Sequence, residues 1–243
     1  MISARRRALV FVAVIALAVA ALAVGVIGRP PAPLPPRPVR ERPTLLLLTS
    51  LPLLFNEDFS LHGGGPPALM KLQSRYRVVP ISVTDPADLS KGRLLLMAHP
   101  LAQPVEDLVA LDVWVRHGGR VLLLADPLLE WPSKQPLGSP LRPPPMFMDT
   151  GLLAHWGLRL DAPDERGPVE RSFGGYKILT VSPGTLHGAC DISSDRLVAH
   201  CRIGQGRAIV IADADLLNLG VLGAAATNNL NALVSELATL EQK

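Results

Sequence analysis

Most residues that could do chemistry follow short apolar runs of the chain. Glu57 and Asp58 come after the run 44–49, Asp126 follows the run 120–125, and Asp213 and Asp215 follow the run 207–212. Ligands of open parallel sheets bind beyond the carboxyl ends of the strands. If the apolar runs are parallel strands, these carboxylates gather at one edge of the sheet and form a binding crevice.

The candidate crevice also includes a histidine and a tryptophan. Asp126-Pro127 could contact a ligand or simply close a strand in a turn. Asp213 and Asp215 could bind a cation or cap the next helix, and Trp131 could stack on a sugar ring, pack on a partner or form a hydrophobic lid contact. The full set of binding candidates is Glu57, Asp58, His62, Asp126, Trp131, Asp213 and Asp215.

Signals for a nucleophile, a metal or a cofactor are weak. The chain has no G-x-S-x-G or G-x-C-x-G elbow. The glycines 63–65 lack the lysine and spacing of a phosphate loop, and His62, His99 and His117 are too scattered to indicate a metal site. We therefore predict no catalytic residue, no metal and no cofactor. Cys190 and Cys201 either form a disulfide or remain two buried thiols.

The elements that must position the crevice alternate between strands and helices. This alternation predicts an α/β domain with a mostly parallel sheet. Gly204-Gln205-Gly206 predicts a hairpin turn between the last two strands. The expected strands are 44–49, 77–83, 93–98, 120–125, 176–181, 196–202 and 207–212, and the expected helices are 68–76, 105–117, 150–156 and 227–240.

The amino-terminal part predicts a membrane anchor. Residues 8–28 form a run of 21 residues without a charge behind Arg5-Arg6-Arg7, which is long enough to cross a bilayer with the arginines inside. A cleaved secretory signal is the alternative. Residues 29–43 are proline-rich, which is typical of an extended spacer. The expected organisation is a cytoplasmic basic end (1–7), a transmembrane anchor (8–28), a proline-rich stalk (29–43) and an extracytoplasmic α/β domain (44–243).

The charge is uneven along the chain. The formal net charge is +3, but residues 1–43 hold seven arginines and one glutamate, which leaves about −3 on residues 44–243. A nucleic-acid partner would require a basic face on that domain. The balance therefore argues against nucleic acid, while the basic end suits an anionic membrane surface.

Two segments resemble a known family. Residues 118–127, with Gly-Gly, an apolar strand and Asp-Pro, and residues 204–218, with Gly-x-Gly-Arg, a strand and Asp-x-Asp, are similar to segments of gliding-type ABC-transporter auxiliary proteins. Asn228 and Asn229 match the Asn that this family places before its final helix. The resemblance implies a flavodoxin-like, class I glutamine amidotransferase-like three-layer domain without the catalytic cysteine.

The resulting functional prediction is a non-catalytic accessory or binding protein in the inner membrane. It has one span, a cytoplasmic amino terminus and a periplasmic domain, and its expected partners are the membrane, ABC-transporter permease or ATPase subunits, or an envelope glycan. The alternatives are a carboxylate-dependent periplasmic hydrolase and a cell-envelope scaffold without a ligand. We also expect the Asp126→Ala variant to fold normally and to lose an envelope phenotype.

Overall fold

The computed structural model describes residues 30–54 and 65–242. The chain divides into two compact units, residues 1–32 and 33–243, and every helix and strand named below belongs to the second unit. The expected anchor at 8–28 and the crevice residues Glu57, Asp58 and His62 lie outside the described residues.

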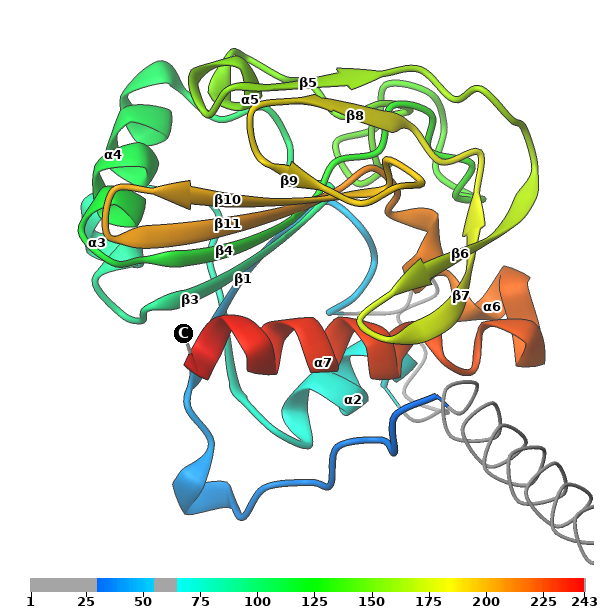
Figure 1. The fold of residues 1–243 in the computed structure, drawn as a ribbon, viewed down its shortest axis with the longest axis horizontal. Coiled ribbons are helices and arrows are strands. Elements are labelled where there is room, and N and C mark those ends of the chain that lie inside the picture. The colour runs from blue at the N-terminus through cyan, green and yellow to red at the C-terminus, as the bar shows by residue number, and fades with distance from the viewer. Residues whose placement is uncertain (1–29, 55–64, 243) are drawn as a thin grey trace, which may run out of the picture. The chain divides into compact units, whose positions relative to one another are not determined.

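A seven-stranded sheet forms the centre of the second unit (Figure 1). Its inner strands are continuous apolar runs, as expected for strands with both faces covered. All five residues of β3 are buried, as are the four central residues of β1. The strand order is β2-β1-β3-β4-β11-β10-β9. The first five strands are parallel, β10 is antiparallel to β11, and β9 is antiparallel to β10 and so runs in the direction of the first five. The strands are β1 (Thr44–Thr49), β2 (Arg77–Pro80), β3 (Leu94–Ala98), β4 (Arg120–Leu124), β9 (Asp191–Ile192), β10 (Val198–Ile203) and β11 (Gly206–Ile211).

Helices cover both faces of this sheet. Figure 1 shows α7 and α2 on one side and α4 with α3 on the other. The apolar stripe of α7 buries Leu230, Leu233, Val234, Leu237 and Leu240, as a helix lying on a sheet requires. The helices are α2 (Pro67–Gln73), α3 (Pro86–Leu89), α4 (Val105–Arg116), α5 (Leu152–His155), α6 (Leu219–Leu222) and α7 (Asn229–Gln242), with 3-10 turns η1 (Val39–Glu41), η2 (Asp215–Leu217) and η3 (Gly223–Ala226).

Two small antiparallel sheets are added to the central one. In the first, β5 (Leu158–Asp161) pairs with β8 (Thr185–Gly188), and in the second β6 (Pro168–Phe173) pairs with β7 (Tyr176–Val181). The apolar residues of β7 predict a strand, whereas β6 alternates between exposed and partly buried positions and carries charges. Such short, solvated strands give no clear apolar pattern, so the sequence did not predict β5, β6 or β8.

The predicted fold class requires correction. A mixed α/β domain with a mostly parallel sheet agrees with the structure. The finer assignment to a three-layer, class I glutamine amidotransferase-like domain behind a transmembrane helix is wrong, because the likeness to solved structures described below lies elsewhere. Alternating strands and helices indicate a layered α/β fold but do not choose among its families.

The predicted localisation is wrong as well. Across residues 30–54 and 65–242, the structure contains no helix with both the length and the apolar character needed to cross a membrane. The prediction of a single-pass inner-membrane protein rested on the apolar residues 8–28 and on the arginines that precede them, which lie outside the described residues.

The proline-rich residues contact the domain. The backbone N–H of Arg37 donates to the carbonyl of Ser74 at 2.9 Å, and the Arg37 guanidinium donates to both carboxylate oxygens of Glu241 at 3.0 and 2.9 Å. The Arg75 guanidinium donates to the carbonyl of Pro35. Residues 34–42 therefore lie against α2 and the end of α7.

Candidate functional site

Strand register places two of the predicted aspartates next to each other. Leu124 of β4 pairs with Ile211 of β11. Asp126 and Asp213 each follow this pair by two residues, so both lie at the carboxyl edge of the sheet and at the same level. The two neighbouring strand ends are what bring them together.

Asp126 is fully buried and holds three backbone N–H groups. Its Oδ2 accepts from Ala214 at 2.8 Å and from Asp215 at 3.4 Å, and its Oδ1 accepts from Leu128 at 2.9 Å. The carboxylate therefore closes the turn after β4 and joins it to the segment after β11.

Asp213 is also fully buried and links two further segments. Its Oδ2 accepts from the N–H of Val181 in β7 at 2.9 Å, and its Oδ1 accepts from the N–H of Leu216 in η2 at 2.7 Å. The second bond resembles a helix cap, in which a side-chain oxygen accepts from a backbone N–H three residues later.

Two further acids complete a cluster of four carboxyl groups, which we call the acid cluster: Asp126, Glu130, Asp213 and Asp215. The Oδ2 of Asp215 accepts from the backbone N–H of Glu130 at 2.7 Å. Oε1 of Glu130 accepts from the hydroxyl of Ser182. Asp215 is only 2% exposed, whereas Glu130 is exposed to solvent, so the cluster meets water through Glu130.

The environment raises the pKa of three of these acids. Burial raises the pKa of Asp126 to about 6, although its backbone hydrogen bonds act in the opposite direction. Burial and then the charge of Asp126 raise the pKa of Asp213 well above its ordinary value. Burial raises the pKa of Asp215 to about 7, and the charges of Asp126 and Glu130 contribute in the same direction. The acid cluster can therefore hold and exchange protons near neutral pH.

A small cavity is lined by chain neighbours of Glu130 and Asp215, although none of the four acids lines it. It has a volume of about 180 Å³, and its wall includes Trp131, Leu53, Pro67, Leu219 and Asn218. Trp131 directly follows Glu130, and the 217–220 segment begins two residues after Asp215. The two loops that carry the exposed and the nearly buried acid therefore also supply the walls of the cavity.

Two residues of this region, Ser182 and Glu130, were not among the candidates predicted from the sequence. Ser182 donates to Glu130 from a backbone with φ of 46°, which is rare for a residue with a side chain; nothing in its sequence context signals this. Glu130 lies between the candidates Asp126 and Trp131, beyond the end of β4. His99, one of the scattered histidines, is fully buried with φ of 48°, and its Nε2 lies 2.9 Å from the carbonyl oxygen of Pro144.

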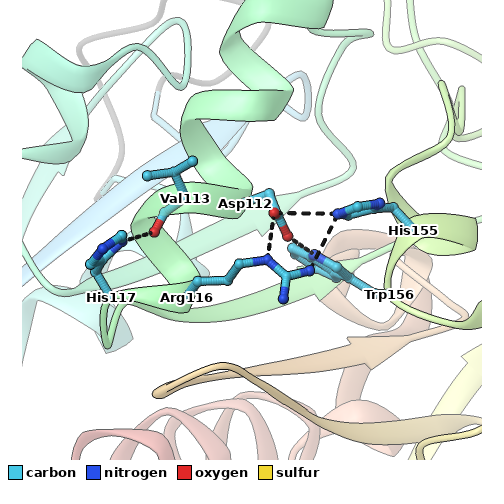
Figure 2. Close-up of polar contacts among 6 residues, drawn as sticks. All are labelled: Asp112, Val113, Arg116, His117, His155 and Trp156. Carbon is cyan, nitrogen blue, oxygen red and sulfur yellow. Dashed lines mark hydrogen bonds and ion pairs between the residues drawn. The ribbon is translucent and has the colours of Figure 1, made fainter.

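A second polar cluster joins α4 to α5 (Figure 2). Asp112 accepts from Nε of Arg116 at 2.7 Å and from the indole N–H of Trp156 at 3.0 Å, and its Oδ2 lies 3.3 Å from Nε2 of His155. Burial raises the pKa of Asp112, but hydrogen bonds from Arg116 and Trp156 outweigh it, so the pKa lies below the ordinary value. Both oxygens of Asp112 are therefore occupied in holding the two helices together.

The cysteines and the possible metal ligands add no further reactive site to the described residues. Cys190 and Cys201 are joined by a disulfide with their Cα atoms 4.9 Å apart. In the part of the chain that the structure describes, no group of three or more His, Cys, Asp or Glu side chains is arranged to hold a metal ion.

Comparisons with known proteins give a likeness of fold only. No family model matches the chain, and no curated protein matches it. An exo-β-1,4-mannosidase from Opitutaceae bacterium strain TAV5 is similar over 82% of this chain and 36% of its own, with a TM-score of 0.50 and 13% identity. A β-galactosidase from Bacillus circulans sp. alkalophilus is similar over 83% of this chain and 31% of its own, with a TM-score of 0.46 and 15% identity.

A smaller protein is similar over nearly all of its length. It is the cytoplasmic protein STM1381 from Salmonella typhimurium LT2, covering 81% of this chain and 99% of its own, with a TM-score of 0.48 and 10% identity. In contrast, the chain spans about a third of the mannosidase and of the galactosidase.

These findings correct the predicted identity. The predicted relationship to gliding-type ABC-transporter auxiliary proteins is wrong: no family model matches the chain, and the likeness of fold with a TM-score of 0.50 is to a mannosidase. The prediction of a non-catalytic transporter accessory is wrong with it, and so is the prediction that the chain is no enzyme, which also rested on the missing nucleophile elbow. The Gly-Gly, strand and Asp-Pro pattern describes how a parallel strand begins and ends, which many α/β families share.

Proposed function

We propose that the chain is a hydrolase of glycosidic bonds that uses the carboxyl groups of Asp215 and Glu130. One observation carries this proposal: Asp215, a nearly buried acid with a pKa of about 7, accepts a hydrogen bond from the backbone N–H of Glu130, whose side chain is exposed. Two acids whose environments differ in this way can divide the roles of proton donor and base.

Each acid has a role that follows from its surroundings. Asp215, protonated up to about pH 7, donates a proton to the leaving oxygen of the substrate. Glu130, which is exposed, acts on the substrate as a base or a nucleophile, as the second carboxylate of glycosidases does. Asp126 and Asp213 position the segments after β4 and β11 through their backbone hydrogen bonds.

The cavity beside these acids supports a sugar as the substrate class. The face of a tryptophan binds the apolar side of a ring, and Trp131 lines the cavity next to Glu130. The cavity of about 180 Å³ suits a single ring-sized group rather than a long chain. The mannosidase that shares part of the fold gives a reason to test glycosides first.

The test is hydrolysis of a panel of p-nitrophenyl glycosides between pH 4 and 9. We expect turnover that falls above about pH 7 as Asp215 loses its proton. We expect Asp215→Asn and Glu130→Gln to lower kcat by at least about 100-fold, since proton transfer by a positioned side chain contributes that much or more.

The matched control is Asp164→Asn, which removes the same group from an exposed loop residue. All variants are checked for an unchanged circular dichroism spectrum. The proposal is wrong if no glycoside is turned over, or if both variants in the acid cluster keep activity within threefold of the control.

A further inference from the structure

The opposite end of the sheet carries a basic cavity with no role in the acid cluster. It has a volume of about 370 Å³ and lies between the β10–β11 hairpin and the last turn of α7. Figure 1 shows the carboxyl end of α7 on the same side of the molecule as the β10–β11 turn. His200, Arg202 and Arg207 line the cavity together with Asp191 and Thr239. We call this set of five residues the basic pocket.

Strand pairing places the cations of the basic pocket side by side. Arg202 of β10 is the direct partner of Arg207 of β11, so their side chains leave the same face of the sheet. His200 is two residues before Arg202 and therefore shares this face. Like charges directly opposite each other on a sheet are destabilising, so this arrangement costs stability unless an anion balances it.

The chain itself does not supply that anion to the arginines. Among the side-chain hydrogen bonds and ion pairs of residues 30–54 and 65–242, none involves the guanidinium of Arg202 or of Arg207, and both residues line the cavity. The acidic residue of the pocket, Asp191, is the strand partner of His200 rather than of an arginine. The N–H donors of both guanidinium groups are therefore available to a ligand in the cavity.

The walls of the basic pocket are fixed. The disulfide joins Cys190, the neighbour of Asp191, to Cys201, which lies between His200 and Arg202. It therefore ties β9 to β10 at the point where the cations project. The carboxyl end of α7 is also anchored, because the Arg120 guanidinium donates to the carbonyl of Glu241.

We propose that the basic pocket binds a phosphate group, either free or carried by a small molecule. Two guanidinium forks can each donate two parallel hydrogen bonds to phosphate oxygens, and the imidazole can donate one more. The open cavity leaves room for the rest of a phosphorylated compound beside α7. This proposal does not depend on the hydrolase proposal, because Arg207 stands near the amino end of β11 and the acid cluster stands beyond its carboxyl end.

The test is a titration of the whole chain with inorganic phosphate and, separately, with glucose 6-phosphate. It uses low ionic strength with chloride as the reference salt, and calorimetry and the NMR signals of the His200 ring are the readouts. We expect a Kd of about 1 mM or below for at least one of the two probes. If glucose 6-phosphate binds more tightly, the ligand of the basic pocket is a phosphorylated small molecule. If inorganic phosphate binds equally or more tightly, the ligand is the free ion.

Substitutions distinguish the pocket from general attraction to a basic protein. We expect Arg202→Gln and Arg207→Gln each to weaken binding at least tenfold. The matched control, Arg166→Gln, removes one charge from an exposed loop residue and should change binding less than twofold. Absence of binding to both probes, or equal weakening by the control, would overturn the proposal. Because two independent variants are made, loss of folding in one leaves the other to decide.

Discussion

At the scale of single residues, the buried aspartates connect loops that the sheet alone does not join. Asp126 and Asp213 together accept five backbone N–H bonds, from the last residue of β7 and from the segments after β4 and β11. An N–H group buried without an acceptor costs about 1–3 kcal/mol. Acidic side chains can therefore remain in this interior because they satisfy several donors at once.

This role makes Asp126→Ala a destabilising change, contrary to the expectation that the variant would fold normally. The alanine leaves the N–H groups of Ala214 and Leu128 without their acceptor, so we expect the free energy of unfolding to fall by about 2–4 kcal/mol. Asp126→Asn keeps one acceptor oxygen and should lose less. Urea denaturation measures both, with Asp164→Ala as a surface control. An Asp126→Ala variant as stable as the control would contradict this role.

At the scale of elements, residues 34–42 act as a strap across α2 and α7. Arg37 is its main attachment. It pairs with Glu241 at 2.9 Å, and its guanidinium carbon lies 5.5 Å from the centre of the buried Tyr76 ring. The side chains of Arg37 and Glu241 are only 19% and 26% exposed, so the ion pair is partly shielded from water. A partly shielded pair with a cation–π contact is worth more than an exposed pair.

We expect Arg37→Ala to release the strap. The loss of the ion pair and the ring contact should lower the free energy of unfolding by about 1–2 kcal/mol. It should also speed amide hydrogen exchange in residues 34–42 while β3 and β4 remain protected. Arg40→Ala is the control, because Arg40 is exposed on the same segment. Equal exchange rates in the two variants would show that Arg37 does not hold the strap.

At the scale of the whole molecule, the raised pKa values of the acid cluster link folding to pH. The pKa values of Asp126 and Asp215 are about 6 and 7 in the folded protein, against about 3.9 in an unfolded chain. The folded state therefore binds protons more tightly than the unfolded state. This stabilisation is complete below about pH 4 and is lost as the pH rises through 6 and 7.

We expect the free energy of unfolding to decrease between pH 5 and pH 8, and Asp215→Asn to reduce that decrease by at least about 1 kcal/mol. His99 acts in the opposite direction, because burial lowers the pKa of its imidazole; comparing the variant with the wild type cancels its contribution. Chemical denaturation at several pH values provides the measurement. Parallel pH profiles for the two proteins would contradict the raised pKa of Asp215.

The sequence by itself determined the inner layers of the fold. The apolar runs give β1 and β7 with the predicted bounds, and β3, β4 and β11 within a residue of them. The apolar stripe at residues 230–240 gives α7. These elements are local, since burial on both faces of a strand or on one face of a helix is visible as a pattern of side chains.

Only the tertiary structure decided which side chains meet. Asp126 and Asp213 converge because Leu124 pairs with Ile211 across 87 positions of the chain, and Arg202 faces Arg207 because of the hairpin register. Ser182 reaches Glu130, and Arg37 reaches Glu241, over separations of 52 and 204 residues. Contacts over such distances depend on strand order and packing. Neither is encoded in any local pattern. The apolar runs predicted that Asp126, Asp213 and Asp215 lie at one edge of the sheet, but they did not predict the contacts with Glu130 and Ser182 or the basic pocket.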